Sequence, residues 1–269
     1  MSENPANPAA EQTARLLLEE HRARKTFGPL PPEHAPKNLA EARAAQEAFV
    51  RLLTGQRGRV AGYKVALTTP AMQKLTGFSE PAYGMLFERT LYSSPHAIRS
   101  ADFVRLGLEC EVAIRMAVDL PASGAPYSAD SVGKAIGSLM PAFEVIEDRA
   151  ADYSQFSARV LDFIADNTWN AGVVLGAGLP LAQAGDLGAV QGRMFINDTL
   201  IAEGHGRDVL GHPLNALVWL ANNLASRGKG LERGMVVMTG SLVPTQFVKP
   251  GDAVRYTLEG FGDIHCRIE

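Results

Sequence analysis

Two glutamates stand inside an otherwise apolar segment, LGLECEVAI at residues 106–114. If this segment is a strand, the alternation of side chains sends Glu109 and Glu111 to the same face. Two carboxylates side by side on a buried face repel each other and are costly to remove from water. Such a pair needs a compensating positive charge.

A third acid occurs in a similar setting. Glu144 lies in PAFEVIED, and on a strand it would share a face with Ala142 and Ile146. Three converging carboxylates suit a hard divalent cation such as Mg²⁺ or Mn²⁺, which keeps water ligands that a substrate can displace. Alternatively, either segment is an edge strand whose glutamates face solvent or pair with nearby arginines. Spacing alone leaves both interpretations open.

A lysine and a small polar segment are further candidates. Lys64 lies in GYKVAL, which is too apolar for a typical surface strand, so its amine could act in proton transfer. The alternative is a lysine with a buried stem and an amine that reaches solvent. TGSL, residues 239–242, brings small residues to a strand end where N–H and hydroxyl groups could face a ligand, but it equally suits a turn.

The composition excludes several classes of protein. The 269 residues carry a net charge of −3 without a basic block, which argues against a nucleic-acid partner. The two cysteines, Cys110 and Cys266, form neither a disulfide framework nor a CxxC metal site. No signal peptide or membrane-spanning run is recognisable, so we expect no membrane association and a cytoplasmic location.

The hydrophobic pattern predicts a large α+β domain rather than a regular βαβ array. We expect a helical N-terminal segment at 1–60, with a tail at 1–8, and a β-rich body at 61–269. Asn38 followed by Glu41 predicts a helix start, as does Thr69 followed by Pro70. The expected helices cover 9–25, 38–53, 70–77, 129–139 and 211–228; the expected strands include 62–67, 104–116, 141–148, 171–177 and a hairpin at 192–204.

Taken together, the segments resemble the 2-oxopent-4-enoate (2-hydroxypentadienoate) hydratase and 4-oxalocrotonate decarboxylase group of the fumarylacetoacetate hydrolase superfamily. The resemblance covers residue 38 to the C-terminus, and the combination is specific although each piece alone is not. The segments that carry it are GYKVALTTPAMQKLTG, YGMLF, LECEVAI, PAFEVIEDR, IADN, GHPLNALVWLAN, MTGSL and PGD.

The resemblance implies a mixed β-roll fold and a role in aromatic catabolism. It also implies a divalent metal, Mg²⁺ or Mn²⁺, held by Glu109, Glu111 and Glu144. Lys64 matches the family's active-site lysine. Two residues, Thr239 and Ser241, match its small polar substrate-binding positions. The implied substrate is a small 2-oxo acid, and the implied assembly is a homo-oligomer, with a hydratase or decarboxylase partner as a further expectation.

Two departures from the family pattern bear on the reaction. The family's hydratases carry an acidic residue where this chain has Ala82, in EPAYG, with Glu80 two residues away. After IADN they carry small residues, whereas this chain has Trp169 and Asn170. We include Trp169 among the expected substrate-binding residues because its size would reshape the pocket.

The sequence therefore leaves several functions open. The first is a metal-dependent lyase, hydratase before decarboxylase, in which Lys64 moves a proton between oxygen and carbon. The second is an acylpyruvate C–C hydrolase, which needs a His/Glu pair that His21, His34 and His96 do not clearly supply. The third is a catalytically silent subunit, which the intact acids and lysine argue against.

Overall fold

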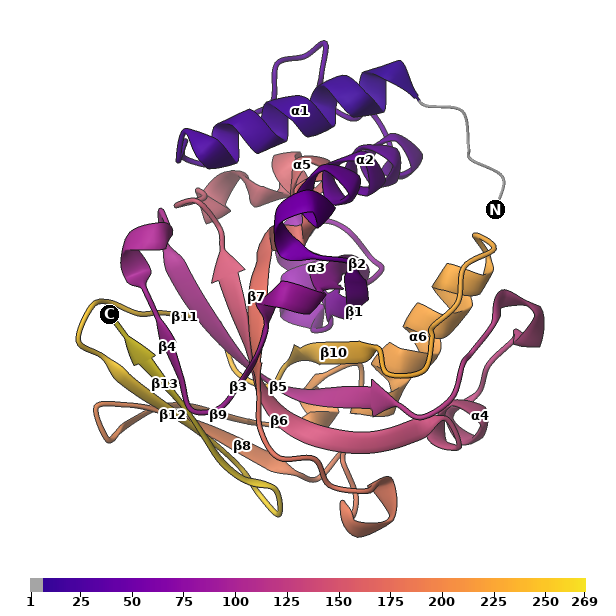
Figure 1. Ribbon diagram of the computed structural model, residues 1–269, viewed down its shortest axis with the longest axis vertical. Helices are drawn as coiled ribbons and strands as arrows, with labels where there is room; N and C mark the ends of the chain where they lie inside the picture. The colour runs from indigo at the N-terminus through magenta and orange to yellow at the C-terminus, as the bar shows by residue number, and fades with distance from the viewer. Residues whose placement is uncertain (1–6) are drawn as a thin grey trace.

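The strand segments assemble into two β-sheets in a computed structural model that describes residues 7–269 (Figure 1). The larger sheet has the order β2 (Ala82–Phe87), β1 (Val60–Ala66), β10 (Val236–Ser241), β5 (Leu106–Met116), β6 (Ile136–Glu147), β7 (Asn170–Leu175) and β3 (Leu91–Ser93), and β11 (Gln246–Phe247) also pairs with β5. The smaller sheet has the order β4 (His96–Ile98), β13 (Gly262–Ile268), β12 (Ala253–Leu258), β8 (Gln191–Ile196) and β9 (Thr199–His205).

Both sheets are mixed, which agrees with the α+β prediction. Strand β1 runs parallel to β10 and β3 runs parallel to β7, whereas β5 pairs antiparallel with both β6 and β10. The hydrophobic core joins the sheets, and the rings of Phe143 on β6 and Tyr256 on β12 lie 5.9 Å apart within it. On β5 the residues Cys110, Val112 and Ile114 all belong to this core, so the glutamates that alternate with them face the other way.

The helices gather mainly around the larger sheet. They are α1 (Pro8–Arg22), α2 (Leu39–Arg57), α3 (Pro70–Thr76), α4 (Ala129–Gly133), α5 (Val160–Ala165) and α6 (Pro213–Ala225). Figure 1 shows α1 and α2 at one end of the molecule and the smaller sheet at the other. Two predicted caps are confirmed, because Asn38 accepts from the Glu41 N–H at 2.9 Å and Thr69 accepts from the Met72 N–H at 3.2 Å.

Several predicted elements differ from the structure. The helix expected over 129–139 ends at Gly133, and β6 already begins at Ile136. Pairing of this stretch with β5, for example Leu139 opposite Ile114, outweighs its local helical pattern. The C-terminal strand β13 was not expected. The tail expected at 1–8 falls largely on residues 1–6, outside the described part of the chain, and the division of the chain at residue 60 stays a prediction.

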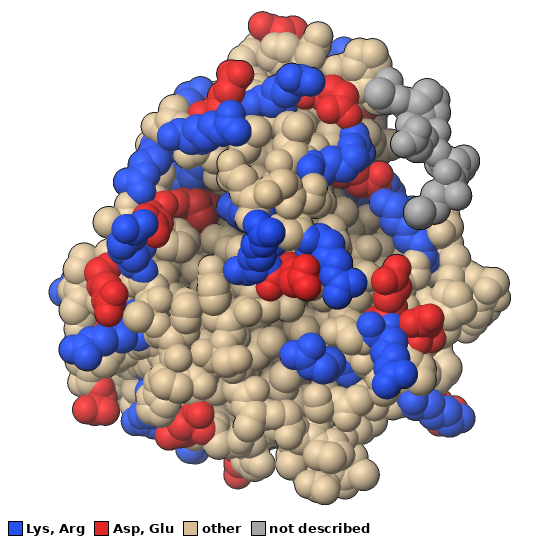
Figure 2. Space-filling model, viewed as in Figure 1, with Lys and Arg blue, Asp and Glu red and all other residues tan. Residues whose placement is uncertain are grey.

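The surface carries charges of both signs. On the face shown in Figure 2, Lys and Arg side chains are interspersed with Asp and Glu rather than gathered into a field of one sign. Within residues 7–269, no helix combines the length and the hydropathy needed to cross a membrane.

A buried aspartate on α5 makes stability depend on pH. Burial raises the pKa of Asp162 on α5 to about 6, although Arg159 opposes the shift. An acid with a raised folded-state pKa stabilises the fold fully only below its unfolded pKa of about 4, and this contribution is lost as pH rises through 6. We expect Asp162→Asn to raise the free energy of unfolding by about 1–2 kcal/mol at pH 8, after screening by solvent and Arg159, and by much less at pH 4.

Denaturant unfolding at both pH values tests this expectation. Asp130→Asn is the matched control, because its side chain is 79% exposed and its removal changes no buried charge. An equal gain from Asp162→Asn at pH 4 and pH 8 would contradict the assignment.

Candidate active site

Three carboxylates converge at the centre of the larger sheet. Glu109 on β5 stands directly opposite Glu144 on β6, and Glu111 follows two residues later on the same face of β5. One oxygen from each carboxylate lies within 4.8 Å of the others. Glu111 and Glu144 are fully buried, whereas Glu109 is half-buried. The alternative of a solvated edge strand is therefore wrong, since β5 and β6 are interior strands.

Each carboxylate accepts a hydrogen bond from an uncharged group that holds it in place. The Gly240 N–H donates to Glu111 Oε2 at 2.7 Å, the Asn170 amide donates to Glu144 Oε1 at 2.8 Å, and the Thr245 hydroxyl donates to Glu109. These contacts orient the oxygens without supplying a charge. Such partners around a cluster of acids are typical of groups that orient metal ligands.

Gly240 can hold Glu111 only because it lacks a side chain. Its φ of +117° is in a region that other residues rarely adopt, and a Cβ there would lie 2.4 Å from Thr68 Oγ1. A shift in the pairing of β10 with β5 between Met238 and Ser241 accompanies this conformation. The glycine of TGSL thus allows the backbone N–H of residue 240 to approach and bond to Glu111.

Lys64 approaches the acids from β1. Its Nζ lies 3.3 Å from Glu144 Oε1, and its side chain is 4% exposed. The interpretation as a lysine that reaches solvent is therefore wrong. The amine is placed at the acid cluster and 5.9 Å from the centre of the Phe163 ring.

One lysine does not neutralise three acids, and the residues fit a divalent cation. Burial, followed by the charges of Glu144 and Glu109, raises the pKa of Glu111 well above its ordinary value. Glu111 Oε1 and Glu144 Oε2 are buried oxygens for which the described residues offer no hydrogen-bond partner. A divalent cation would satisfy these oxygens and offset the repulsion, since carboxylate oxygens are the ligands that Mg²⁺ and Mn²⁺ prefer.

Asn170 reaches Glu144 because the backbone before it is left-handed. The three residues Asn167, Thr168 and Trp169 have φ values of 50°, 50° and 60°. This conformation is costly for residues other than glycine and persists only when its surroundings enforce it. Asn167 is clamped to both the N–H and the carbonyl of Met85, at 2.8 and 2.9 Å.

A buried ion network fixes the start of the same segment. Arg149 donates to Asp166 at 2.8 Å and to Glu20 at 3.2 Å, and His21 Nε2 lies 2.5 Å from Asp166. Burial alone would raise the pKa of Asp166, but His21 and Arg149 hold it below its ordinary value. Helix α1 thereby supports the wall of the site through Glu20 and His21.

A cavity of about 560 Å³ opens beside the acids. Glu109 and Lys64 line it, together with α3 residues and the loop after β10. Much of its surface is aromatic, and the rings belong to Tyr153, Phe156, Phe163, Trp169 and Phe247. A largely apolar cavity with a few polar groups at one end is typical of a small-molecule site.

The remaining predicted residues are placed as follows. Trp169 and Ser241 line the cavity. Thr239 is fully buried, donates its hydroxyl to the Val112 carbonyl at 2.8 Å and is absent from the lining. Ala82 is buried in an apolar cluster with Trp169, and Glu80 is exposed. Substrate binding by Thr239, Ser241 and Trp169 stays a prediction.

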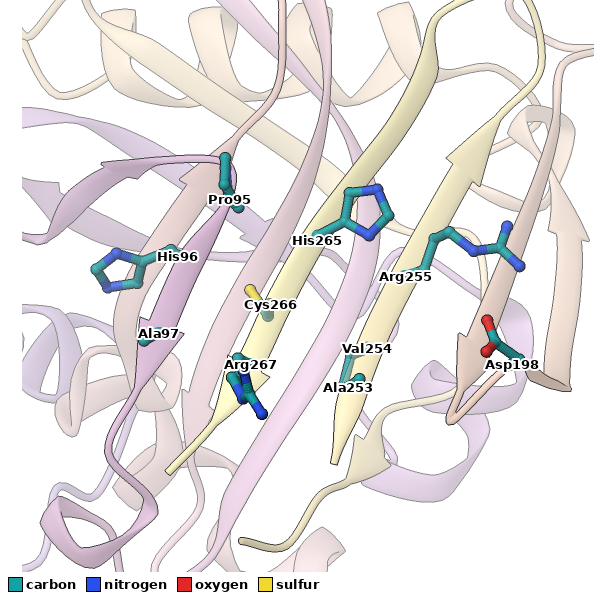
Figure 3. A pocket seen from close by; sticks show the side chains of 10 residues that line it. All are labelled: Pro95, His96, Ala97, Asp198, Ala253, Val254, Arg255, His265, Cys266 and Arg267. Atoms are coloured by element: carbon teal, nitrogen blue, oxygen red, sulfur yellow. The ribbon is translucent and has the colours of Figure 1, made fainter. Parts of the chain in front are cut away.

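A second hollow lies on the smaller sheet (Figure 3). Strands β4, β12 and β13 line it, and His96, His265 and Arg255 are among its side chains. None of the three clustered acids is among its lining residues, so this hollow is not part of the candidate active site.

The sequence left three contributors unrecognised. Asn170 was noted only as a departure from the family pattern, and its position three residues after Asn167, a residue type that tolerates the αL conformation, is its only local signal. The Gly240 N–H lies in TGSL, whose N–H groups were considered as ligand contacts rather than as partners of an acid, and the Thr245 hydroxyl had no signal. Both roles depend on how β10 and the loop after it meet β5.

Loss of the Asn170 amide tests its role. We expect Asn170→Ala to weaken Mn²⁺ binding about 10–100-fold, because Glu144 loses the donor that orients it. Isothermal calorimetry measures the affinity. Asn215→Ala on α6 is the control, since among the described residues this exposed amide bonds only to the Leu210 carbonyl. Equal affinities in both variants would contradict the role.

The clustered acids, buried lysine and adjoining cavity are typical of enzymes that use a bound divalent cation. The chain belongs to the fumarylacetoacetate hydrolase family, whose model, described as fumarylacetoacetate (FAA) hydrolase C-terminal, matches residues 64–269. The match spans the two sheets and contains all three acids and Lys64.

Individual relatives agree with this assignment. A 2-keto-4-pentenoate hydratase of Paraburkholderia phymatum is 32% identical, over 95% of this chain and 96% of its own. A 2-oxo-hept-4-ene-1,7-dioate hydratase of Escherichia coli is 30% identical, over 94% and 96%. The structure of 4-oxalocrotonate decarboxylase from Pseudomonas putida G7, complexed with magnesium and adipate, superposes with a TM-score of 0.87 at 25% identity and 97% coverage of both chains.

Proposed function

We propose that this enzyme is a divalent-metal-dependent hydro-lyase that adds water to a 2-oxo or 2-hydroxydienoic acid. The observation that carries the proposal is the buried set of Glu109, Glu111 and Glu144 with Lys64 at 3.3 Å from Glu144, at one end of an apolar cavity. Relatives named as hydratases, matched over nearly the whole chain, support the reaction class.

The chain's own residues suggest how the reaction proceeds. A cation bound by Glu109, Glu111 and Glu144 would supply positive charge to the developing negative charge on the substrate's oxygens. Lys64, whose amine lies 3.3 Å from Glu144, would hold a proton beside those oxygens and move it to or from carbon. The aromatic side chains exclude bulk water from the rest of the substrate. In net terms, a hydroxyl and a hydrogen from water add across the carbon–carbon double bond.

A decarboxylase is the second candidate. The magnesium-bound decarboxylase structure and Ala82, at the position where family hydratases carry an acid, both favour it. Loss of CO₂ requires no base to activate water, so it tolerates Ala82 better than hydration does. The histidines discussed for a C–C hydrolase give no support, because His21 is bound to Asp166 and the lining within residues 7–269 contains no histidine.

Two assays with Mg²⁺ or Mn²⁺ separate these functions. Hydration is followed by loss of the ultraviolet band of 2-hydroxypenta-2,4-dienoate, and decarboxylation by CO₂ release from 2-oxohex-3-enedioate. We expect hydration to be the faster reaction. Faster CO₂ release would assign the enzyme to the decarboxylase branch, and no turnover of either compound would contradict the lyase proposal for these substrates.

A further inference from the structure

The cavity carries charge only at the end where the acids lie. Among its lining residues in the described chain, only Lys64 and Glu109 are charged. Lys64 is already paired with Glu144 at 3.3 Å. A substrate with one carboxylate can place that carboxylate at this end of the cavity. The lining residues supply no cation to pair with a second carboxylate.

The wall that leads away from this end is aromatic. The Phe163 ring lies 5.9 Å from Lys64 Nζ, and the Trp169 ring lies 4.7 Å from Phe163. Phe156 then stacks on Trp169 at 5.1 Å, and Tyr153 meets Trp169 edge-on at 6.0 Å. We call Tyr153, Phe156, Phe163 and Trp169 the aromatic wall.

Two hydroxyls along this wall are already engaged within the protein, whereas the buried Trp169 indole N–H has no partner among the described residues. The Tyr153 hydroxyl donates to Asp148 at 3.1 Å, and the Thr168 hydroxyl beside the wall donates to the Asn167 carbonyl at 2.8 Å. A carboxylate placed here would lose its water and could gain at most this one neutral donor, the Trp169 N–H, and no cation, which is unfavourable. An alkyl or aryl group would lose nothing and would bury apolar surface.

Arg105, a cation beside two rings of the lining, is also committed. The Arg105 guanidinium lies 4.3 Å from the centre of the Phe247 ring and 5.8 Å from that of Tyr153. The Arg105 guanidinium forms a bidentate ion pair with the carboxylate of Asp148, whose side chain is fully buried. Turning Arg105 toward a ligand would leave that buried carboxylate unpaired, so the arrangement opposes it.

We propose, building on the function proposed above, that the substrate is a 2-oxo or 2-hydroxydienoic monoacid with a bulky apolar tail. Its carboxylate and C2 oxygen lie at the acids, and its alkyl or aryl tail lies along the aromatic wall. A cavity of about 560 Å³ has room for such a tail beyond a five-carbon acid. The substrate thus differs in tail from the short monoacid and the dioate that two relatives are named for.

Unreactive saturated acids measure the tail preference by binding. The probes are 2-oxopentanoate, 2-oxooctanoate and 2-oxoheptanedioate, each titrated with Mg²⁺ present. The readout is quenching of Trp169 fluorescence in a Trp219→Phe background, since Trp219 is the only other tryptophan and is absent from the lining. Each buried methylene is worth about fourfold in affinity, so 2-oxooctanoate, with three more methylenes, should bind roughly sixtyfold tighter than 2-oxopentanoate. The dioate should bind at least tenfold more weakly than 2-oxooctanoate.

Variants assign the preference to the wall. Trp169→Leu should reduce the preference for 2-oxooctanoate several-fold, with calorimetry as readout because this variant lacks the reporter. If it fails to fold, Phe247→Ala replaces it, since this lining ring is 44% exposed and its loss removes little from the core. Phe195→Ala on the smaller sheet is the control and should change nothing.

The outcomes separate the two proposals. Binding of all three acids with the dioate tightest, or with equal affinity for the short and long monoacids, would overturn the apolar-tail inference and leave the lyase function standing. An unchanged preference in the lining variants would also overturn it. Absence of binding by every probe, together with no turnover of 2-hydroxypenta-2,4-dienoate, would overturn the proposed function and this inference with it.

Discussion

Replacing Lys64 by methionine is expected to lower kcat by about 10²–10⁴-fold, the range typical for loss of a proton-transfer group. Methionine has a similar length and fills the same buried space, so the cavity should keep its shape. The variant also leaves Glu144 without its only ion-pair partner among the described residues, at 3.3 Å. We therefore expect lower thermal stability without metal and recovery of much of that loss when Mg²⁺ is added, because the cation then compensates the acids.

Steady-state kinetics and thermal unfolding with and without Mg²⁺ measure both effects. Lys74→Met is the matched control, because this exposed lysine lies on α3 beside the cavity and is absent from its lining. Retention of most of the wild-type kcat in Lys64→Met would remove Lys64 from the proposed mechanism.

Replacing Glu111 by glutamine is expected to weaken Mg²⁺ or Mn²⁺ binding by more than ~100-fold. This loss of affinity is larger than the one expected when only a group that orients a metal ligand is removed. Glutamine keeps the shape and can still accept the hydrogen bond from the Gly240 N–H. Without metal the same variant should be more stable than the wild type. The reason is that burial and the neighbouring acids raise the pKa of Glu111, so its ionised form is unfavourable in the folded protein.

Calorimetry with Mn²⁺ and melting curves with and without Mg²⁺ test the two opposite effects. In the wild type a saturating cation should add about 3 kcal/mol of stability at 100 times its dissociation constant, and in Glu111→Gln this increment should vanish. Glu203→Gln, an exposed acid on β9, is the control. Undiminished Mn²⁺ affinity in Glu111→Gln would show that the three acids do not form the metal site.

These two variants probe a site whose charges are arranged for a ligand rather than for stability. Three acids and one lysine at the centre of an interior sheet are costly in the protein alone. The fold tolerates them because the cores around them are extensive and because Asn170, Gly240 and Thr245 hold the carboxylates in place. Function at this position thus depends on elements far apart in the chain.

The sequence by itself determined the features that follow from local geometry. Alternation along a strand placed Glu109 and Glu111 on one face and Cys110, Val112 and Ile114 on the other, as the structure has them. The helix starts at Asn38 and Thr69 follow from side chains that bond to a nearby N–H. Such patterns depend on neighbours a few residues apart, so they are readable without the fold.

The family resemblance implied which acids meet, but only the tertiary structure decided how they meet and what surrounds them. Glu144 faces Glu109 because of the register between β5 and β6, and Lys64 reaches Glu144 from β1. Asn170 depends on three left-handed residues enforced by the clamp on Met85, and the aromatic wall gathers rings from several elements. Strand register and side-chain packing are set by burial and strand pairing between segments far apart in the chain. Many alternative pairings have similar local energies, so no short stretch of sequence is enough to predict the one that forms.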